Sequence, residues 1–467
     1  MENRQRYLAE QSPRPSERPV VVCVIPSYNE ADSIANTLES LLEQTRIPDR
    51  IAVMVNNTTD RTIDVCQKFQ GPQLRTVMGE EYHCVVDVID LGKVEDKKVG
   101  ALNAGFAYAA EHQADFLLGC DGDTTAQPEA LADLLAEAHA DPRIGGISAK
   151  YSISKRRHKD AGLFARLFLI PGQRAQFAAF NLDNLLRGRQ MAVLGGQFSI
   201  FSMRALCQVM EDNHQKAPWT RDSAVEDSLL SLQLVDSGFL TKISATAHAY
   251  VGPMTTIRAL HAQQVKWTQG FLDLMWPGQR GDTRGKPFHR NLRLRWRELL
   301  GMSANIVMRA AFVALLAATL LMHAFVWNWI WITPVAISLA LNMKIALSMH
   351  DRSAVDFFYA TIVPAEIYML LRMGHFLASV FKFWSKSALD TWAAQYKAEA
   401  GGGVEWITPF MVLASMAAFG AFLWWKSGPA IRDAFLIVGW PLLAVITVGQ
   451  TAVMVRKLFR RHRGYQV

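Results

Sequence analysis

Residues 116–123 read FLLGCDGD, a short apolar run that stops at an Asp-Gly-Asp triplet. A short apolar run bounded by turn residues is typical of a strand that is buried on both faces. Two carboxylates at spacing i, i+2, here Asp121 and Asp123, can chelate one hard divalent cation from a single turn. An ordinary Asp-Gly turn has the same residue pattern, so the triplet alone is compatible with either metal binding or a simple turn.

The segments before this strand alternate between strand and helix patterns. Apolar runs predict strands at residues 20–25, 50–55 and 85–91, and helical patterns lie at residues 29–44, 61–68 and 98–112. Such alternation predicts a parallel sheet with helices on both faces, a Rossmann-like α/β domain. Ligands bind such sheets beyond the carboxyl ends of the strands. The polar motifs PSYNE, NNTTD and DGD all lie at these ends.

The composition points to a membrane protein. Half of the 467 residues are hydrophobic and the formal net charge is +7, which excludes a disordered chain. The long apolar runs gather after residue 301, and basic residues flank them: Arg284, Lys286, Arg290, Arg293, Arg295, Arg297, Arg456, Lys457, Arg460, Arg461 and Arg463. Basic residues beside membrane spans mark the cytoplasmic side. No basic patch interleaved with aromatic residues occurs elsewhere, so we expect no nucleic-acid partner.

Five apolar segments are candidate spans: residues 302–322, 327–347, 357–381, 406–425 and 434–455. A segment of about 20 residues is long enough to cross a hydrocarbon core of about 30 Å. The third segment carries Glu366, Arg372 and His375, and charges buried in lipid are costly. Two cytoplasmic ends require an even number of crossings. We therefore predict four spans, with residues 357–381 along the interface or re-entrant, and a fifth crossing remains the alternative.

The termini and cysteines are consistent with a cytoplasmic catalytic part. The first 20 residues are polar and contain prolines, so we expect a flexible arm at residues 1–18 and no signal peptide. The five cysteines form no CxxC pair, which argues against a disulfide framework and a zinc site. Such cysteines suit a reducing compartment.

Three further polar motifs each allow two interpretations. Lys98, just before a helix, lies where anions bind, or it is a solvent-exposed charge. The Glu226-Asp227 pair starts a helix and supplies either its N-terminal cap or a general base. The QQVKW motif at residues 263–267 combines amides, a cation and an indole. These groups can hold phosphate and sugar, or the Trp can anchor a helix at a membrane surface.

The order of the motifs is more specific than any one of them. PSYNE, NNTTD, KVGALN, DGD, GGQFSIFSMRAL, VEDSLLSLQLVDSGF and QQVKW follow one another between residues 20 and 267. This series resembles membrane-integrated family 2 glycosyltransferases, which include cellulose, chitin, hyaluronan and poly-N-acetylglucosamine synthases. The resemblance implies a GT-A-like α/β domain in the cytosol at residues 19–290, with amphipathic interface helices. It also implies an α-helical transmembrane domain at residues 291–467 with a basic cytosolic tail.

The resemblance also implies roles for individual residues. Asp227 would be the catalytic base, with Glu226 beside it, and Asp123 would bind Mg²⁺ or Mn²⁺. The nucleotide sugar would contact Pro26, Tyr28, Glu30, Asn57, Lys98, Asp121, Gln263, Gln264 and Lys266. The acceptor would contact Trp267, Gly195 and Gly196. Three departures from the family pattern stand out: Asn56-Asn57 where Asp is common, Val225 in place of Thr, and Lys266 in place of Arg, which loses the bidentate fork.

The predicted function is inverting transfer of a sugar from a UDP-sugar to a growing polysaccharide, with export through the transmembrane region. The expected location is the plasma membrane, with the catalytic domain and both termini in the cytoplasm. One alternative is transfer of a single sugar to a lipid-linked acceptor. An alternative of another class is a non-catalytic membrane receptor that binds nucleotide sugars.

Overall fold

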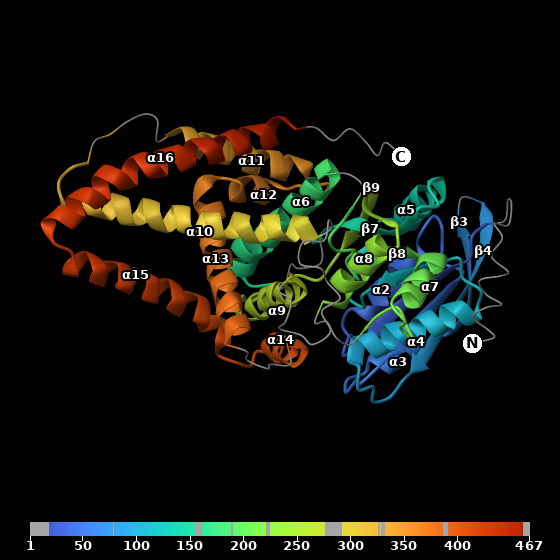
Figure 1. The fold of residues 1–467 in the computed structure, drawn as a ribbon. Coiled ribbons are helices and arrows are strands. Elements are labelled where there is room, and N and C mark those ends of the chain that lie inside the picture. Colours follow the sequence, from blue (N-terminus) through green and yellow to red (C-terminus); the bar gives the residue numbers. More distant parts are fainter. Residues whose placement is uncertain are drawn as a thin grey trace.

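The structure is a computed structural model that describes residues 18–77, 79–154, 161–187, 190–220, 225–275, 292–325, 327, 332–385 and 391–460. Figure 1 shows two parts side by side: an α/β part and a group of long helices, with α9 (Ile257–Met275) between them. The predicted arm up to residue 17, the domain boundary at residues 290–291, and the basic residues Arg284, Lys286, Arg290, Arg461 and Arg463 lie outside the described residues.

The α/β part is built on a nine-stranded mixed sheet in the order β3-β4-β2-β1-β5-β8-β7-β9-β6. The strands are β1 (Val21–Ser27), β2 (Arg50–Val55), β3 (Gly71–Val77), β4 (Glu80–Asp90), β5 (Phe116–Cys120), β6 (Thr125–Ala126), β7 (Ile144–Ser152), β8 (Phe198–Ser202) and β9 (Leu240–Tyr250). β4, β2, β1 and β5 are parallel neighbours. β1 lies between β2 and β5, so the chain changes direction across the sheet at β1.

Alternating side chains send two apolar layers to opposite faces of the sheet. Val21, Cys23 and Ile25 of β1 pack in the cluster that contains α2 (Ile34–Leu42), α3 (Thr62–Gln67) and α5 (Ala130–Ala140). Val22 and Val24 pack in the cluster that contains α4 (Lys97–Glu111), α7 (Met203–Asp212) and α8 (Glu226–Asp236). The sheet is therefore the middle layer of three, and its strand ends remain open for a site.

The predicted α/β fold is confirmed, and the parallel strands lie at its centre. The structure adds strands that the sequence analysis did not include: β3 pairs antiparallel with β4, and β8 pairs antiparallel with both β5 and β7. β8 lies far along the chain from β5 and β7, and β3 joins β4 through a short hairpin, so neither arrangement leaves a βαβ pattern in the sequence. The β8 pairings therefore depend on tertiary structure, and they lie on the opposite side of the parallel strands from β3.

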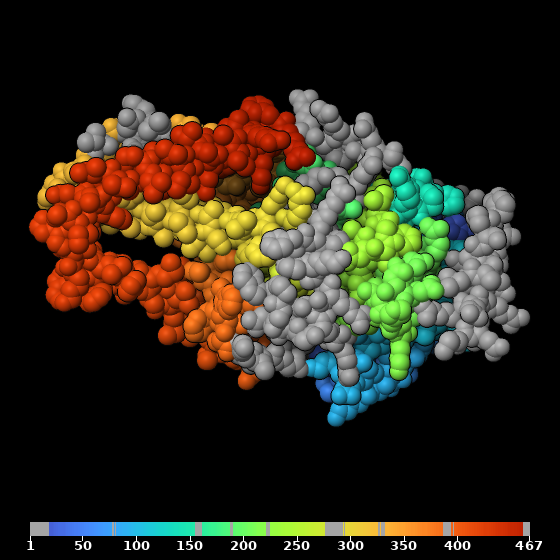
Figure 2. Space-filling model, viewed as in Figure 1, coloured from blue at the N-terminus to red at the C-terminus, as the bar shows by residue number. Residues whose placement is uncertain are grey.

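The remaining helices connect the sheet to the apolar part. They are α6 (Ile170–Arg187), preceded by a π-helix at Ala165–Leu169, then α10 (Leu292–Leu321), α11 (Ile332–Ser348), α12 (Ala354–Tyr359), α13 (Ile362–Trp384), α14 (Thr391–Glu399), α15 (Thr408–Lys426) and α16 (Pro429–Phe459). α13 packs against α9 and α15 and runs across α10 (Figure 1). Figure 2 shows an open gap between α15 and α10.

Three helical segments of the described chain are long and apolar enough to cross a membrane: Arg295–Leu321, Glu405–Lys426 and Pro429–Phe459. The shorter apolar helix Ile332–Ser348 corresponds to the second predicted span, whose first residues lie partly outside the description. α13 is not among the three. The four-span topology, with residues 357–381 at the interface, therefore stays a prediction.

A buried ion pair joins the two parts. The guanidinium of Arg174 on α6 donates from Nε to Asp356 Oδ1 at 2.9 Å and from Nη2 to Oδ2 at 3.1 Å. Their side chains are only 3% and 1% exposed. Arg174 also donates to the carbonyls of Ile153 and Asp351, and Asp356 caps α12 together with Ser353. The Arg174 side chain thus connects α6 to the N-terminal end of α12.

Arg174→Ala should strongly lower the thermal stability of the protein in detergent. The substitution leaves the Asp356 carboxylate buried without its cation, a change that costs about 3–5 kcal/mol in folded proteins. Arg143→Ala is the matched control, because Arg143 also pairs with an aspartate but its side chain is 59% exposed, and exposed pairs contribute about 0–1 kcal/mol. Equal melting temperatures for the two variants would contradict the prediction.

Candidate active site

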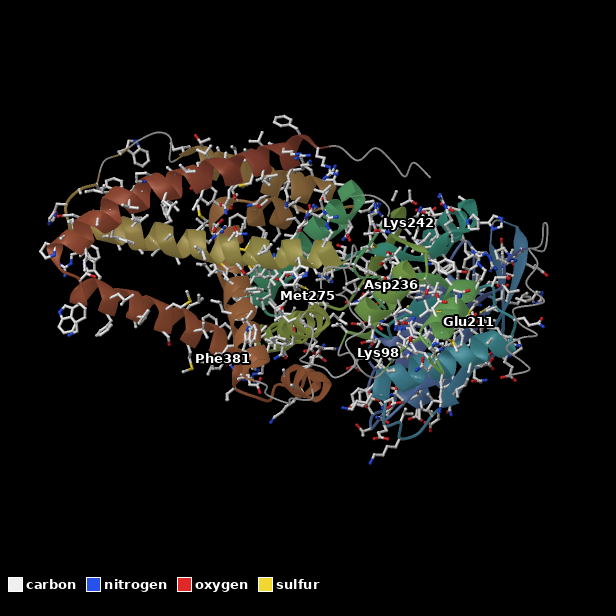
Figure 3. The ribbon with its side chains drawn as sticks, in the orientation of Figure 1. Lys98, Glu211, Asp236, Lys242, Met275 and Phe381 are labelled. Atoms are coloured by element: carbon white, nitrogen blue, oxygen red, sulfur yellow. The ribbon has the colours of Figure 1, made fainter. Side chains whose placement is uncertain are left out.

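A cavity of about 1260 Å³ lies at the carboxyl ends of β1, β2 and β5 and extends between α6, α9, α10 and α13. Figure 3 shows Lys98 on the side of the α/β part that faces α9. Every predicted site residue except Gly196 lines this cavity: Pro26, Tyr28, Glu30, Asn57, Lys98, Asp121, Asp123, Gly195, Glu226, Asp227, Gln263, Gln264, Lys266 and Trp267. The tertiary fold therefore brings segments 240 residues apart into one site.

The loops after β1 and β2 form one rim of the cavity and hold each other in place. Asn29 and Asn57 adopt left-handed backbone conformations, with φ of 54° and 53°, which Asn tolerates better than most residues. Asn29 Oδ1 accepts a hydrogen bond from the Thr59 backbone N–H at 2.8 Å. Asn57 Oδ1 accepts from Val94 N–H at 2.6 Å and its Nδ2 donates to Val94 O at 2.9 Å. The Asn57 amide is thus engaged in positioning the loop before α4.

Lys98 is the cation at the centre of the acidic wall. Its Nζ lies 2.6 Å from Asp121 Oδ1 and 3.8 Å from Glu226 Oε1. Burial opposes the charged form of Lys98, but the negative charges of Asp121, Glu226 and Asp227 outweigh burial and raise its pKa above the ordinary value. Lys98 therefore stays protonated at neutral pH and can attract a diphosphate to this wall.

A second group of carboxylates surrounds Asp123. Burial, reinforced by the charge of Asp121, raises the pKa of Asp123 to about 6. Burial, reinforced by Asp123, raises the pKa of Glu30 to about 8. Both shifts arise mainly from burial, and the neighbouring carboxylates add to them.

This donor set fits a divalent cation that binds together with a substrate. Within the described part of the chain, no group of three or more His, Cys, Asp or Glu side chains forms a complete metal site. Mg²⁺ is usually bound by one or two carboxylates plus substrate phosphates rather than by a cage of protein ligands. Asp123, with Asp121 beside it in the same turn, would supply the carboxylate oxygens for that arrangement.

Asp227 is the second residue of α8 and lines the cavity. The backbone N–H of Gly196 donates to Asp227 Oδ2 at 2.9 Å, and a Cβ on residue 196 would come within 2.8 Å of the same oxygen. Gly196 does not line the cavity, and its N–H orients the Asp227 carboxylate, so acceptor contact by Gly196 stays a prediction. A side chain at residue 196 would therefore push the Asp227 carboxylate out of this position.

The pH dependence of the reaction should follow Asp227. Burial, reinforced by the charge of Glu226, raises its pKa to about 8, and a general base must be deprotonated to act. We expect kcat/KM for the donor to rise about tenfold per pH unit between pH 6 and 7 and to level off above pH 8, since this parameter follows the free enzyme. A profile that is flat from pH 6 to 9 at saturating metal would contradict this assignment.

α9 brings the QQVKW side chains to the opposite wall. Lys266 is only 6% exposed, and burial lowers its pKa to about 7. Gln264 Oε1 accepts a hydrogen bond from Gln176 Nε2 of α6 at 3.1 Å, which fixes the orientation of that amide. Trp267 is partly exposed on the same wall. The cavity therefore has a charged end at the sheet and a mixed aromatic and amide wall at α9.

The structure adds cavity residues that the sequence analysis did not assign to the site. They come from α6, α13 and α14 and include Gln176, Phe177, Phe180, Met369, Arg372, His375, Phe376, Gln395 and Glu399. Arg372 and His375 had been noted only as costly polar residues in an apolar segment. Their presence in an apolar segment is the sequence feature that could indicate a site here, because polar side chains in apolar helices commonly face a functional cavity.

Two sequence families match the chain. The profile of "Glycosyl transferase family 2" matches residues 22–208, and that of "Glycosyl transferase family group 2" matches residues 117–349. Their overlap, residues 117–208, contains the Asp-Gly-Asp triplet and all of β5 except Phe116. The matched region thus extends from the first strand of the sheet into the apolar helices.

Characterised relatives include poly-beta-1,6-N-acetyl-D-glucosamine synthases. The protein from Staphylococcus aureus (strain MSSA476) is 22% identical over 255 residues, which is 54% of each chain. The protein from Staphylococcus epidermidis is 22% identical over 248 residues, or 52% of each chain. The alignment thus spans about half the length of these relatives.

Among solved structures, a mannosyltransferase from Pyrobaculum calidifontis in complex with GDP-Man and Mn²⁺ is 18% identical, with a TM-score of 0.47, and covers 83% of this chain and 94% of that one. S. aureus TarS 1–349 in complex with UDP is 13% identical, with a TM-score of 0.36, and covers 79% and 92%. With the two sequence families matched along residues 22–349 and the predicted motifs gathered in one cavity, the chain belongs to the family 2 glycosyltransferases.

Proposed function

We propose that this glycosyltransferase uses a UDP-sugar to elongate a polysaccharide with inversion at the anomeric carbon. The observation that carries the proposal is that one cavity is lined by all the groups this reaction needs. They are the cationic side chain of Lys98, the carboxylates Asp121 and Asp123, the buried candidate base Asp227, and the indole of Trp267. The relatives at 22% identity make N-acetylglucosamine the first sugar to test.

In the proposed reaction, Asp227 takes the proton from the acceptor hydroxyl. The acceptor oxygen then forms a bond to the anomeric carbon while the bond between that carbon and the diphosphate oxygen breaks. UDP leaves with the electron pair, and the proton stays on Asp227. Since a single displacement occurs from the opposite face, the product has inverted configuration. Gly196 keeps the Asp227 carboxylate in place during this step through its N–H.

The leaving diphosphate lies between Lys98 and Lys266 in this proposal. Lys98 holds a positive charge among the strand-end carboxylates, and Lys266 approaches from α9. A divalent cation held by Asp123 would neutralise charge that develops on the diphosphate. The loop hydrogen bonds of Asn29 and Asn57 keep the nucleotide side of the cavity in shape.

The long helices suit a membrane location next to the active site. The three apolar segments include Arg295–Leu321, and Met302 and Asn305 of that segment line the same cavity. We propose that the catalytic part is cytoplasmic, because basic residues concentrate beside the spans, and that the polymer leaves the cavity along these helices. Transfer of one sugar to a lipid-linked acceptor would end instead with a single addition.

The experiment measures release of the nucleoside diphosphate by the purified full chain, which is UDP from UDP-N-acetylglucosamine or UDP-glucose and GDP from GDP-mannose. Release from a UDP-sugar with a product of many units supports the proposal. A product with one added sugar favours the lipid-linked alternative. Binding of UDP-sugars without release would identify a receptor and overturn the enzymatic proposal.

Trp267→Ala should shorten the product while donor binding stays nearly unchanged. The indole is the large flat apolar group of the QQVKW motif, and an aromatic contact of this kind contributes about 0.5–1.5 kcal/mol beyond area burial. Gln264→Ala should instead weaken UDP binding, since its amide suits phosphate oxygens. The measurements are product length, UDP affinity and melting temperature. Unchanged product length with a lower melting temperature would show that Trp267 only anchors the helix.

A further inference from the structure

α13 forms a wall of the active-site cavity with polar groups that the proposed reaction does not use. Met369, Arg372, His375 and Phe376 line the cavity, and their spacing of i, i+3, i+6 and i+7 places them on one side of the helix. Figure 1 shows α9 between α13 and the sheet. This wall is therefore remote from the strand ends that hold the nucleotide motifs.

His375 has one ring nitrogen engaged and the other without a partner. Its Nδ1 lies 2.9 Å from Nδ1 of His261 on α9, and both side chains belong to residues that are 2% exposed. His375 Nε2 is buried and has no hydrogen-bond partner among the residues that the structure describes. Since a buried polar group without a partner costs about 1–3 kcal/mol, such a group is commonly completed by a ligand or by water.

In either tautomer, the contact with His261 leaves His375 Nε2 able to form a hydrogen bond with a hydroxyl group. If His375 accepts at Nδ1, its Nε2 carries a hydrogen and donates; if it donates at Nδ1, its Nε2 is an acceptor. A sugar hydroxyl can satisfy either state, because it both donates and accepts. His261 fixes the plane of the ring in both cases through the Nδ1 contact.

The guanidinium of Arg372, on the same side of α13, is a second group with hydrogen-bond donors available for a ligand. It is half-buried, lines the cavity, and forms no hydrogen bond or ion pair with the residues that the structure covers. Its planar guanidinium offers five N–H donors in a rigid fork. Arg372 and His375 lie one helical turn apart, a distance that neighbouring hydroxyls of a sugar chain can span.

We propose that Arg372 and His375 form an acceptor subsite that binds hydroxyl groups of the growing saccharide beyond the unit stacked on Trp267. The proposal rests on the function proposed above, because it assigns the acceptor half of the same cavity. Trp267 offers an apolar face to one sugar, and α13 supplies the hydrogen bonds for the polar rim of the next. Neither residue takes part in bond formation, so both are binding residues.

The test compares His375→Phe, which keeps a ring without polar atoms, with His375→Gln, whose amide keeps a hydrogen-bonding group. Ser379→Ala is the control on the same helix, because its hydroxyl donates only to the His375 carbonyl, at 2.7 Å, and it does not line the cavity. The probe is a β-1,6-linked N-acetylglucosamine tetrasaccharide. Its dissociation constant is measured without donor, and its KM is measured with UDP-N-acetylglucosamine. UDP affinity and melting temperature complete the set.

We expect His375→Phe to raise the dissociation constant and KM of the tetrasaccharide about 5-fold to 10-fold, the effect of one lost hydrogen bond. His375→Gln should recover part of this loss, Arg372→Gln should reproduce it, and Ser379→Ala should behave as the wild type. UDP affinity should stay within about twofold. Unchanged tetrasaccharide binding in both His375→Phe and Arg372→Gln overturns the proposal, as does a loss confined to a polyprenyl-diphosphate-linked acceptor.

The two proposals can fail separately. Tetrasaccharide binding is measured without turnover, so it reports on the α13 subsite even if UDP-N-acetylglucosamine is not the donor. In one outcome, the wild type releases no nucleoside diphosphate from any donor while His375→Phe still binds the tetrasaccharide more weakly than the wild type. That pair of results would exclude the enzymatic function and support the subsite.

Discussion

Asp227→Asn is expected to lower sugar transfer by a factor of about 10²–10⁴, the usual effect of losing a general base. The fold should be unaffected. An Asn oxygen can still accept the 2.9 Å hydrogen bond from the Gly196 N–H. The amide cannot take a proton from the acceptor hydroxyl, so the loss should appear in kcat while UDP binding remains.

The matched control is Asp236→Asn. Asp236 is the last residue of the same helix, is exposed, and does not line the cavity. Figure 3 marks it on the α/β part. Both variants should melt close to the wild-type temperature, but only Asp227→Asn should lose turnover. Near-normal turnover in folded Asp227→Asn would remove Asp227 as the base and leave Glu226 as the next residue to examine.

Asp123→Ala is expected to abolish the metal dependence of the reaction together with most of its rate. A bound cation stabilises a leaving diphosphate by several kcal/mol, which corresponds to about a hundredfold or more in rate. In the wild type, a chelator should stop UDP release and added Mg²⁺ or Mn²⁺ should restore it. Calorimetry should show metal-dependent UDP binding in the wild type and none in Asp123→Ala.

Asp64→Ala provides the comparison for this variant, because Asp64 is an exposed aspartate of α3 outside the cavity. It should respond to chelator and metal as the wild type does. Persistent UDP release by the wild type in excess chelator would show that the Asp-Gly-Asp triplet is only a turn.

The strands at the centre of the sheet could be predicted from the sequence because their evidence is local. Phe116–Cys120 and Arg50–Val55 are short apolar runs, and the observed strands have the predicted bounds. The polar motifs after such strands had to meet at one edge, since the carboxyl ends of parallel strands lie together. The gathering of most site residues around one cavity follows from this rule and from the resemblance to a known motif order.

Other features depend on contacts between segments that are far apart in the chain. Gly196 meets Asp227 because the segment before β8 donates backbone hydrogen bonds to side chains of α8, from Leu194 to Ser231 and from Gly196 to Asp227, which no local pattern of residues 195–203 indicates. The side-chain amide of Asn57 is hydrogen-bonded to the backbone of Val94, which is 37 residues away in the chain. The Arg174–Asp356 pair spans 182 residues, so its burial could not be read from either segment.

The sequence by itself determined the parallel α/β core, the strand-end motifs, and the presence of apolar helices after residue 301, because periodicity and composition are properties of neighbouring residues. Only the tertiary structure decided that α13 faces the active-site cavity and that His261 and His375 meet at 2.9 Å. The physical reason is that polar residues in an apolar helix are costly wherever they point. Only packing against α9 determines which of them face the cavity.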